Sequence, residues 1–470
     1  EPGDGRQGDG RQGDRATGDG RQGDRATGRQ TTGTQDWRSW WPKNSLQEAV
    51  VKLSRGLVLL SFGLTLGTTG GSSQAVDPAL AHARRLLDQT ILIDGHNDLP
   101  WAIRASKDAP RDVIAYDLRS RTRGMTDLPR LAQGRVGAQF WSIYVPGEIR
   151  DSGYARVQLE QFDIARRMIA RYPDRLVLAL GADDIVRAHR EHKIASLLGM
   201  EGGHAIENSL GALRSYYALG ARYLTLTHNV TLDWADAALD TARHQGLTSF
   251  GREVVREMNR LGMLVDLSHV SPSVMSNVLD VAEAPVIFSH SSARALVDYP
   301  RNVPDSILAR VPRNGGVVMV TFVPSFVSRA VDSAERTSDS AVAALTRDVA
   351  DTAERRRISR EYRQAHPAPH ATLADVASHI EHVRRVAGID HVGIGSDFDG
   401  IEAGPDGLED VSTFPALFAE LIRRGWSDGD LKKLAGENLL RALRQAEATA
   451  ARLQRERPAS TATIGGLDGK

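Results

Sequence analysis

The stretch Ile91-Leu-Ile-Asp-Gly-His-Asn-Asp98 joins a short apolar run to a cluster of polar side chains at its carboxyl end. The apolar run is typical of a strand that is buried on both faces. In an extended chain, the His-x-Asp spacing places the side chains of His96 and Asp98 on the same face. The stretch therefore predicts a strand that carries two candidate ligands or catalytic groups at its end.

Seven more apolar runs follow, at residues 137–145, 193–200, 223–227, 263–268, 285–289, 316–322 and 391–396. They alternate with helix candidates at residues 157–172, 250–261, 271–282 and 372–387, and two further candidates lie at 413–424 and 428–446. This alternation predicts a parallel sheet covered by helices, and eight strands are the number of a TIM barrel. We therefore expect an α/β fold, a (β/α)8 barrel, over residues 77–450.

The composition of the 470 residues narrows the function. Hydrophobic residues make up 41% and charged residues 25%, as in ordinary globular proteins, and Lys plus Arg equals Asp plus Glu at 59 each. No overall field would draw the chain to nucleic acid, so we expect a small-molecule partner. The chain has no cysteine. Any metal would therefore be held by His, Asp and Glu.

The regions outside the strand pattern receive separate predictions. Residues 1–45 contain near-perfect copies of GDGRQGDRAT and are expected to be a disordered extension. Residues 46–76 hold basic residues, an apolar run at 56–67 and a small polar stretch, which predicts a secretory signal. The protein would then be periplasmic or secreted; if that run is a docked helix instead, it would be cytoplasmic. Residues 328–370 are expected to form a helical insertion or lid, and residues 451–470 a polar tail.

Six of the eight runs end in a candidate ligand or catalytic group. These groups include His96, Asp98, Glu201, His228, Asp266, His269, His290, Asp397 and Asp399. Any one of them is explained as a helix cap or turn residue. Together they would point into one mouth of the barrel, where burying so much charge without a metal is costly. Three imidazoles, one aspartate and one glutamate suit zinc, manganese or cobalt, and their number suits two ions.

Other metal-like or catalytic patterns carry less weight. The histidine pairs His379/His382 and His189/His192 lack the spacing of a helical zinc site, and we interpret both as solvated helix faces. The stretch 397–400 resembles the start of a calcium loop but lacks the later acidic ligands. The sequence has no Gly-x-Ser-x-Gly elbow and no phosphate-binding glycine loop. A serine hydrolase and a nucleotide enzyme are therefore disfavoured.

Several motifs in a fixed order resemble the membrane (renal) dipeptidases, peptidase family M19 of the metal-dependent hydrolases. They are Asp94-Gly-His-Asn-Asp-Leu-Pro-Trp101, Gln139-Phe-Trp-Ser142, Glu201-Gly-Gly-His204, Tyr223-Leu-Thr-Leu-Thr-His228, Val286-Ile-Phe-Ser-His-Ser-Ser292, Arg301-Asn-Val-Pro-Asp305 and Asp397-Phe-Asp-Gly400. The similarity spans residues 92–443. It implies a zinc-dependent dipeptidase that cleaves free dipeptides, L-L and in some members L-D, with a metal-bridging hydroxide.

The resemblance also implies a role for each site residue. One zinc would be held by His96, Asp98 and Glu201, and the other by Glu201, His269 and His290, so that Glu201 bridges two ions per subunit. His228 would stabilise the oxyanion. Arg301 would bind the carboxylate of the dipeptide, and Asp397 would move a proton from the attacking oxygen to the leaving amine. Vertebrate members are disulfide-linked dimers, so a chain without cysteine would form a non-covalent homodimer at most.

Two alternatives remain open. The first is another binuclear-metal amidohydrolase, such as an N-acyl amino acid deacylase or a β-lactam or lactone hydrolase, with the same metals and a different pocket. An arginine placed for a free carboxylate, Arg301, favours the dipeptidase. The second is a non-catalytic barrel, which would be expected to lack a ligand or Asp397, and the sequence lacks none of them.

Overall fold

The computed structural model describes residues 77–149 and 153–469. The predicted disordered extension (1–45) and the predicted signal segment (46–76) lie outside these residues. Within them, none of the helices combines the length and the apolar composition that a membrane span requires. The described residues all belong to one compact unit.

Nine parallel strands lie in the described part of the chain, and eight of them close into a barrel. Their bounds are β1 (Leu92–Asn97), β2 (Val136–Tyr144), β3 (Leu176–Leu178), β4 (Ile194–Glu201), β5 (Ala221–Thr225), β6 (Leu264–Asp266), β7 (Val286–Phe288), β8 (Val317–Val320) and β9 (Val392–Ile394). The strand order is β2-β1-β9-β8-β7-β6-β5-β4-β3, and a further pairing of β2 with β4 closes the ring. The predicted (β/α)8 barrel is thus confirmed.

The strand β3 was not predicted, although its three residues belong to the apolar run Leu176-Val-Leu-Ala-Leu180. It pairs with the first residues of β4, from Ile194 to Ser196, where β5 has not yet begun. It therefore extends the sheet beside the barrel without entering the ring.

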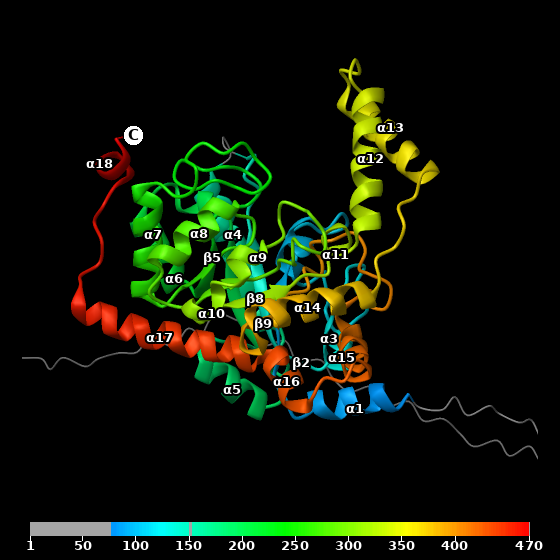
Figure 1. Cartoon of the computed structure of the whole chain (residues 1–470), viewed down its shortest axis with the longest axis horizontal. Helices are drawn as coiled ribbons and strands as arrows, with labels where there is room; N and C mark the ends of the chain where they lie inside the picture. Colours follow the sequence, from blue (N-terminus) through cyan, green and yellow to red (C-terminus); the bar gives the residue numbers. More distant parts are fainter. Residues whose placement is uncertain (1–76, 150–152, 470) are drawn as a thin grey trace, which may run out of the picture. The chain divides into compact units, whose positions relative to one another are not determined.

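Helices surround the barrel (Figure 1). Those before the insertion are α1 (Pro78–Leu87), α2 (Leu99–Arg104), α3 (Leu128–Gln133), α4 (Tyr154–Arg171), α5 (Ala182–Arg190), α6 (Leu210–Ala218), α7 (Ser249–Leu261), α8 (Pro272–Val281), α9 (Asp305–Leu308), α10 (Val311–Asn314) and α11 (Pro324–Val327). The later ones are α12 (Arg329–Leu345), α13 (Thr352–Ala365), α14 (Leu373–Ala387), α15 (Phe414–Arg423), α16 (Asp428–Lys432), α17 (Asn438–Glu456) and α18 (Ile464–Asp468).

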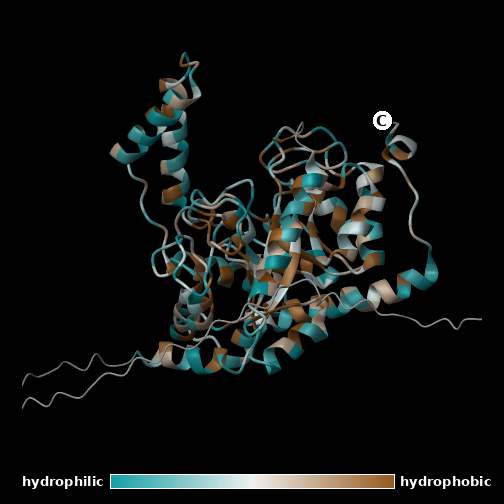
Figure 2. Ribbon diagram, turned by 180° about the vertical axis from the view of Figure 1, so that it is seen from behind, coloured by the Kyte–Doolittle hydropathy of each residue, from teal (hydrophilic) through white to brown (hydrophobic). Residues whose placement is uncertain are grey.

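Two layers of apolar side chains form the core. Inside the barrel, Ile93, Phe140, Leu197, Tyr223 and Met319 belong to one buried cluster, which α5 and α17 also join. A second and larger cluster lies between the strands and the surrounding helices. In Figure 2 the hydrophobic colour concentrates in the strands. Because the interior of the ring is filled, the open space available for chemistry is at the carboxyl ends of the strands.

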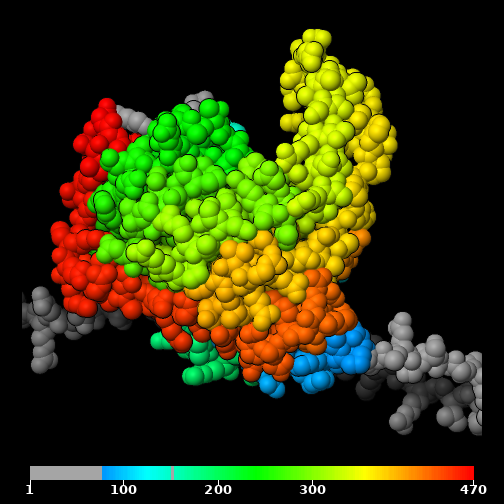
Figure 3. All heavy atoms as spheres, in the orientation of Figure 1, coloured from blue at the N-terminus to red at the C-terminus, as the bar shows by residue number. Residues whose placement is uncertain are grey.

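The predicted helical insertion is present as α12 and α13. In α12 only Val331 and Ser338 are buried, and α13 has no buried residue. The two helices form a hairpin that projects beside the barrel (Figure 1). A cleft of about 1050 Å³ lies between it and the loops after β8 and β9. Figure 3 shows the hairpin, drawn in yellow, standing out from the rest of the surface.

The helix predicted at 428–446 is divided into α16, a π-helical turn at Lys433–Glu437 and α17. The break falls at Gly436, where a Cβ atom would come within 2.3 Å of the Ile91 carbonyl oxygen, so the close approach to the start of β1 requires glycine. Beyond α17, part of the predicted polar tail packs beside α7, where Asp468 Oδ1 accepts from the Phe250 N–H at 3.2 Å.

Candidate metal centre

All five predicted metal ligands lie at the carboxyl ends of barrel strands. His96 is in β1 with Asp98 just after it, Glu201 ends β4, and His269 and His290 follow β6 and β7. None is more than 8% exposed. His269 has φ +69° and the glycine after Glu201, Gly202, has φ +106°. The chain therefore turns sharply where it delivers these ligands, as strained backbone at a functional site often does.

The five side chains form two groups that share Glu201. In the first group, His96 Nε2 lies 3.2 Å from Asp98 Oδ2 and 3.3 Å from Glu201 Oε2. In the second, Glu201 Oε1 lies 3.0 Å from His269 Nε2 and 3.6 Å from His290 Nε2. Each oxygen of Glu201 thus faces a different group. This is the arrangement expected of a carboxylate that bridges two ions.

Each imidazole has a partner on its outer nitrogen. Nδ1 of His96 lies 2.9 Å from the Tyr223 hydroxyl, Nδ1 of His269 lies 3.0 Å from Asn229 Oδ1, and Nδ1 of His290 lies 2.8 Å from the Ser289 hydroxyl. An amide oxygen can only accept, so Nδ1 of His269 carries the proton. These contacts aim the Nε2 lone pairs at one another, as outer partners do in metal sites.

The donor set fits a pair of cations. His269 Nε2 and His290 Nε2 lie 3.0 Å apart, and His96 Nε2 is buried and has no hydrogen-bond partner among the described residues. Lone pairs held this close would repel in a dry site. Two zinc-nitrogen bonds of about 2.0–2.1 Å at a tetrahedral angle hold their nitrogens roughly 3.3–3.4 Å apart. The separations observed within both groups are close to that value.

Charge is concentrated around the shared glutamate. Burial opposes the charged form of His96, but Tyr223, Glu201 and Asp98 outweigh it and raise the pKa of His96 well above its usual value. Burial also opposes the charge of Glu201, yet His96 and His269 hold its pKa well below the usual range. A bound cation would stabilise this carboxylate in the same way.

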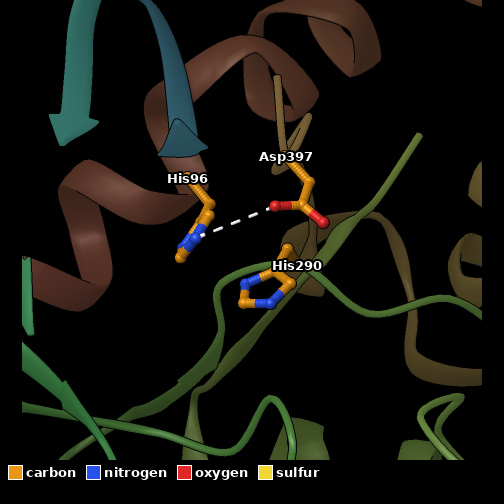
Figure 4. Close-up of side chains that lie close together, drawn as sticks. All are labelled: His96, His290 and Asp397. Carbon is orange, nitrogen blue, oxygen red and sulfur yellow. Dashed lines mark ion pairs between the residues drawn. The ribbon is translucent and has the colours of Figure 1, made fainter. Parts of the chain in front are cut away.

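Asp397 follows β9 and borders both groups. Its Oδ1 atom lies 3.9 Å from His96 Nε2, and Figure 4 shows its carboxyl group directed at His96 and beside His290. Burial raises the pKa of Asp397 well above its usual value, and Asp98 and Glu201 add to this rise against the opposing charge of His96. A carboxyl group with a raised pKa holds a proton more readily than an ordinary aspartate, which suits it to accept and return one.

Arg301 and His228 face the same cavity. Arg301 is 1% exposed, and its Nε and Nη1 atoms have no hydrogen-bond partner among the described residues, while Nη2 donates to His290 Nε2 at 2.8 Å. Burial lowers the pKa of Arg301 to about 10. Burial also lowers the pKa of His228, which favours its neutral form. The site thus holds an incompletely paired guanidinium beside a neutral imidazole.

A cavity of about 420 Å³ connects these groups, and His228, Arg301 and Asp397 line it together with four of the five predicted ligands. This volume lies in the range of about 300–1,000 Å³ typical of small-molecule sites. The sequence did not assign the aromatic part of its wall, which consists of Trp101, Tyr144, Tyr299 and Phe326. Two positions could have indicated this wall from the sequence. Tyr144 lies at the end of the predicted strand 137–145, and Tyr299 lies two residues before Arg301.

One interpretation of the histidine pairs was wrong. His379 and His382 are not on a solvated face, since they are only 1% and 5% exposed. His379 Nδ1 accepts from the Ala293 N–H at 3.0 Å, and His382 Nε2 lies 2.7 Å from Asp305 Oδ1. The two histidines attach α14 to the loop that carries Arg301, a tertiary contact that the helical pattern could not reveal. His192 is exposed and His189 half-buried.

The chain matches a known protein family and individual relatives. The model of the membrane dipeptidase family, peptidase family M19, matches residues 80–457. Dipeptidase 3 of Mus musculus is 42% identical over 378 residues, which cover 79% of this chain and 68% of that protein.

Two crystal structures are also similar. The probable dipeptidase PvdM from Pseudomonas aeruginosa has a TM-score of 0.69 at 25% identity, covering 79% of this chain and 99% of that one. A metallo peptidase from Rhodobacter sphaeroides, liganded with a phosphinate mimic of the dipeptide L-Ala-D-Ala, has a TM-score of 0.63 at 25% identity, covering 76% and 99%.

Proposed function

The chain belongs to the membrane dipeptidase family, peptidase family M19, and is a metallo-dipeptidase; we propose that it uses two zinc ions to hydrolyse the peptide bond of free dipeptides. The proposed zinc ligands are His96, Asp98, Glu201, His269 and His290. The observation that carries this proposal is the pair of ligand groups that meet at Glu201, each with its donor atoms within 4.8 Å of one another. Zinc prefers such a mixture of imidazole and carboxylate ligands in sites without cysteine.

Bound there, two zinc ions would polarise the scissile carbonyl and lower the pKa of a water molecule. The remaining chemistry belongs to the side chains around them. Asp397 would take the proton of the attacking water and pass it to the leaving amine, which its raised pKa and its position beside both ligand groups support.

Arg301 would bind the terminal carboxylate of the dipeptide. Its Nε and Nη1 atoms are buried and have no hydrogen-bond partner among the described residues, so the guanidinium keeps donors available for a charge-assisted hydrogen bond to a carboxylate. The charge of the substrate would also offset the cost of burying the guanidinium. Recognition of a free carboxylate favours dipeptides over substrates whose carboxyl end is blocked.

His228 would stabilise the oxyanion that develops on the scissile carbonyl. It lines the cavity, and its ring lies 4.3 Å from that of the proposed ligand His269 and 4.7 Å from that of Tyr144. The lowered pKa of His228 favours a neutral imidazole, which can donate one N–H to a developing negative charge. Because the donor is already fixed in place, the transition state gains this hydrogen bond without reorganisation.

The stereochemistry of the second residue is also part of the proposal. We expect cleavage of L-L dipeptides and, with them, of L-D dipeptides. The related Rhodobacter sphaeroides structure holds a phosphinate mimic of L-Ala-D-Ala, which supports acceptance of a D residue in this type of site.

The test is a panel of L-L and L-D dipeptides together with one N-acetylated dipeptide and one tripeptide. Hydrolysis is measured with the purified protein, with the chelated protein and after zinc is restored. We expect cleavage of free dipeptides only, loss of activity on chelation and recovery with zinc. Activity restricted to the N-acetylated dipeptide would contradict the assigned substrate class while leaving the metal site intact.

A further inference from the structure

Two buried aspartates of the barrel are bound in the same way by a serine from a neighbouring strand end. Asp94 in β1 accepts from the Ser396 N–H at 2.7 Å and from its hydroxyl at 2.7 Å. Asp266 at the end of β6 accepts from the Ser289 N–H at 2.8 Å and from its hydroxyl at 2.6 Å. All four residues are 0% exposed. The two pairs differ in what the serine oxygen contacts next.

Only Ser289 reaches an imidazole of the metal centre. Its oxygen lies 2.8 Å from Nδ1 of His290. The Ser396 oxygen instead accepts from the Phe398 N–H at 3.2 Å and lies 3.3 Å from the backbone oxygen of His96. The chain Asp266, Ser289 and His290 therefore connects a buried carboxylate to a proposed zinc ligand through one hydroxyl group. The Asp94 pair provides a comparison that lacks this connection.

The direction of each hydrogen bond in this chain is determined. Asp266 accepts from the N–H groups of Ser268 and Ser289 and from the hydroxyls of Thr225 and Ser289. A carboxylate with four donors directed at it has no place for a proton of its own. The Ser289 hydroxyl hydrogen is thus committed to Asp266, and its oxygen must accept from the His290 Nδ1–H. His290 Nε2 then carries a lone pair, which accepts from Arg301 Nη2 at 2.8 Å and lies 3.6 Å from Glu201 Oε1 on the side of the second metal position.

We infer that Asp266 and Ser289 are positioning residues that fix the tautomer of His290 and so set the affinity of the second metal position, formed by Glu201, His269 and His290. The inference rests on the proposed two-zinc function. At the first position, the outer partner of His96 is the Tyr223 hydroxyl rather than a chain that ends in a carboxylate. Loss of the Ser289 hydroxyl should therefore weaken one metal position and leave the other unchanged.

The test is a competition titration of the zinc enzyme and its variants against a chromogenic chelator, with total zinc counted by mass spectrometry. The His269→Ala variant identifies the binding step of the second position, since His269 belongs to that position only. In Ser289→Ala we expect this step to weaken about 10–100-fold, the usual effect of losing an outer partner of a metal ligand. The other binding step should keep its wild-type affinity.

Ser396→Ala is the matched control, because it removes the same kind of buried hydroxyl bond to an aspartate without touching an imidazole ring. It should leave the His269-dependent step unchanged. Equal weakening of that step in both serine variants would indicate a general packing effect and would overturn the inference. Wild-type affinity for both zinc ions in Ser289→Ala would overturn it as well.

A second measurement uses only the wild-type protein, so it does not depend on whether a variant folds. Nitrogen-15 NMR of the wild-type zinc enzyme, labelled at histidine, should show His290 protonated at Nδ1 and ligated through Nε2. Ligation through Nδ1 would overturn the inference. If the wild-type protein binds fewer than two zinc ions, the proposed function fails instead, so the two failures can be told apart.

Discussion

At Asp397, burial and charge act on one carboxyl group in opposite directions. Its backbone has φ +67°, so the residue is held in a conformation that few side chains adopt. Burial raises its pKa well above the usual value although His96 lies nearby. The structure therefore maintains a carboxyl group that is poorly suited to permanent ionisation, as a proton carrier in catalysis requires.

We predict that Asp397→Asn lowers kcat by about 10²–10⁴-fold, the usual contribution of a general acid or base. The zinc content should remain at the wild-type level, because Asp397 belongs to neither of the two proposed ligand sets. Steady-state kinetics with metal analysis on the same sample provides both readings. Loss of zinc in this variant would place Asp397 among the ligands, and an unchanged kcat would remove it from the proton transfer.

Arg301 gives a second prediction at the scale of the residue. Arg301→Lys keeps the positive charge but loses the planar fork, so a free dipeptide should bind with a KM about 10–100-fold higher, as expected for one lost charge-assisted hydrogen bond. A dipeptide amide should be turned over equally poorly by both proteins. Equal KM values of the wild type and Arg301→Lys for the free dipeptide would contradict the proposed contact between Arg301 and the substrate carboxylate.

At the scale of the element, α14 supports the loop that carries Arg301. His379 accepts from the Ala293 N–H through Nδ1, and its Nε2 lies 3.2 Å from the Val327 carbonyl oxygen. Because the second contact requires a proton on Nε2, the ring must be neutral to make both bonds. Burial accordingly lowers the pKa of His379 to about 4.

This shift predicts how stability depends on pH. The unfolded chain binds a proton at His379 near pH 6.5 and the folded chain only near pH 4, so the free energy of unfolding should fall as the pH drops between these values. The shift corresponds to a loss of up to about 3 kcal/mol. Denaturant titrations of wild type and His379→Asn at pH 7, 6, 5 and 4 would show a shallower decline in the variant. If the free energy of unfolding of the two proteins fell equally with pH, the assigned role of His379 would be contradicted.

Unlike α14, the hairpin of α12 and α13 is expected to contribute little to the stability of the barrel, since its helices bury almost no residues. Replacing the hairpin by a short linker should shift the thermal midpoint by less than about 4 °C, because about 1 kcal/mol or less is lost from a chain of this size. The cleft beside it shares Val323 and Ile401 with the catalytic cavity. We therefore expect a changed preference among dipeptides but preserved hydrolysis. A large fall in the midpoint would show that the hairpin supports the barrel.

The elements differ in how well the sequence predicted them. Runs such as 193–200 and 391–396 are apolar because their strands are buried on both faces, and this local cause is visible in the sequence. The strand Leu176–Leu178 was missed although it lies in the apolar run 176–180. The break at Gly436 could not be predicted, because it depends on the approach of a distant segment, the start of β1. The burial of His379 had the same kind of cause.

At the scale of the whole molecule, the site is assembled from the ends of six strands that are far apart in the sequence. The meeting of the five proposed ligands could be predicted because they follow four apolar runs, His96 and Asp98 sharing the first, and a parallel barrel brings such ends together. The chain from Asp266 to His290 and the aromatic wall were not predicted. Their side chains meet only through the register of neighbouring strands and the path of the loops, as in the pairing of Asp266 with Ile287.

The most direct test of the account is a crystal structure of the zinc enzyme with anomalous data at the zinc absorption edge. We predict two peaks on either side of Glu201, one within bonding distance of His96 and Asp98 and the other within bonding distance of His269 and His290. A single peak, or a pair held by other side chains, would contradict the proposed metal centre and the chemistry derived from it.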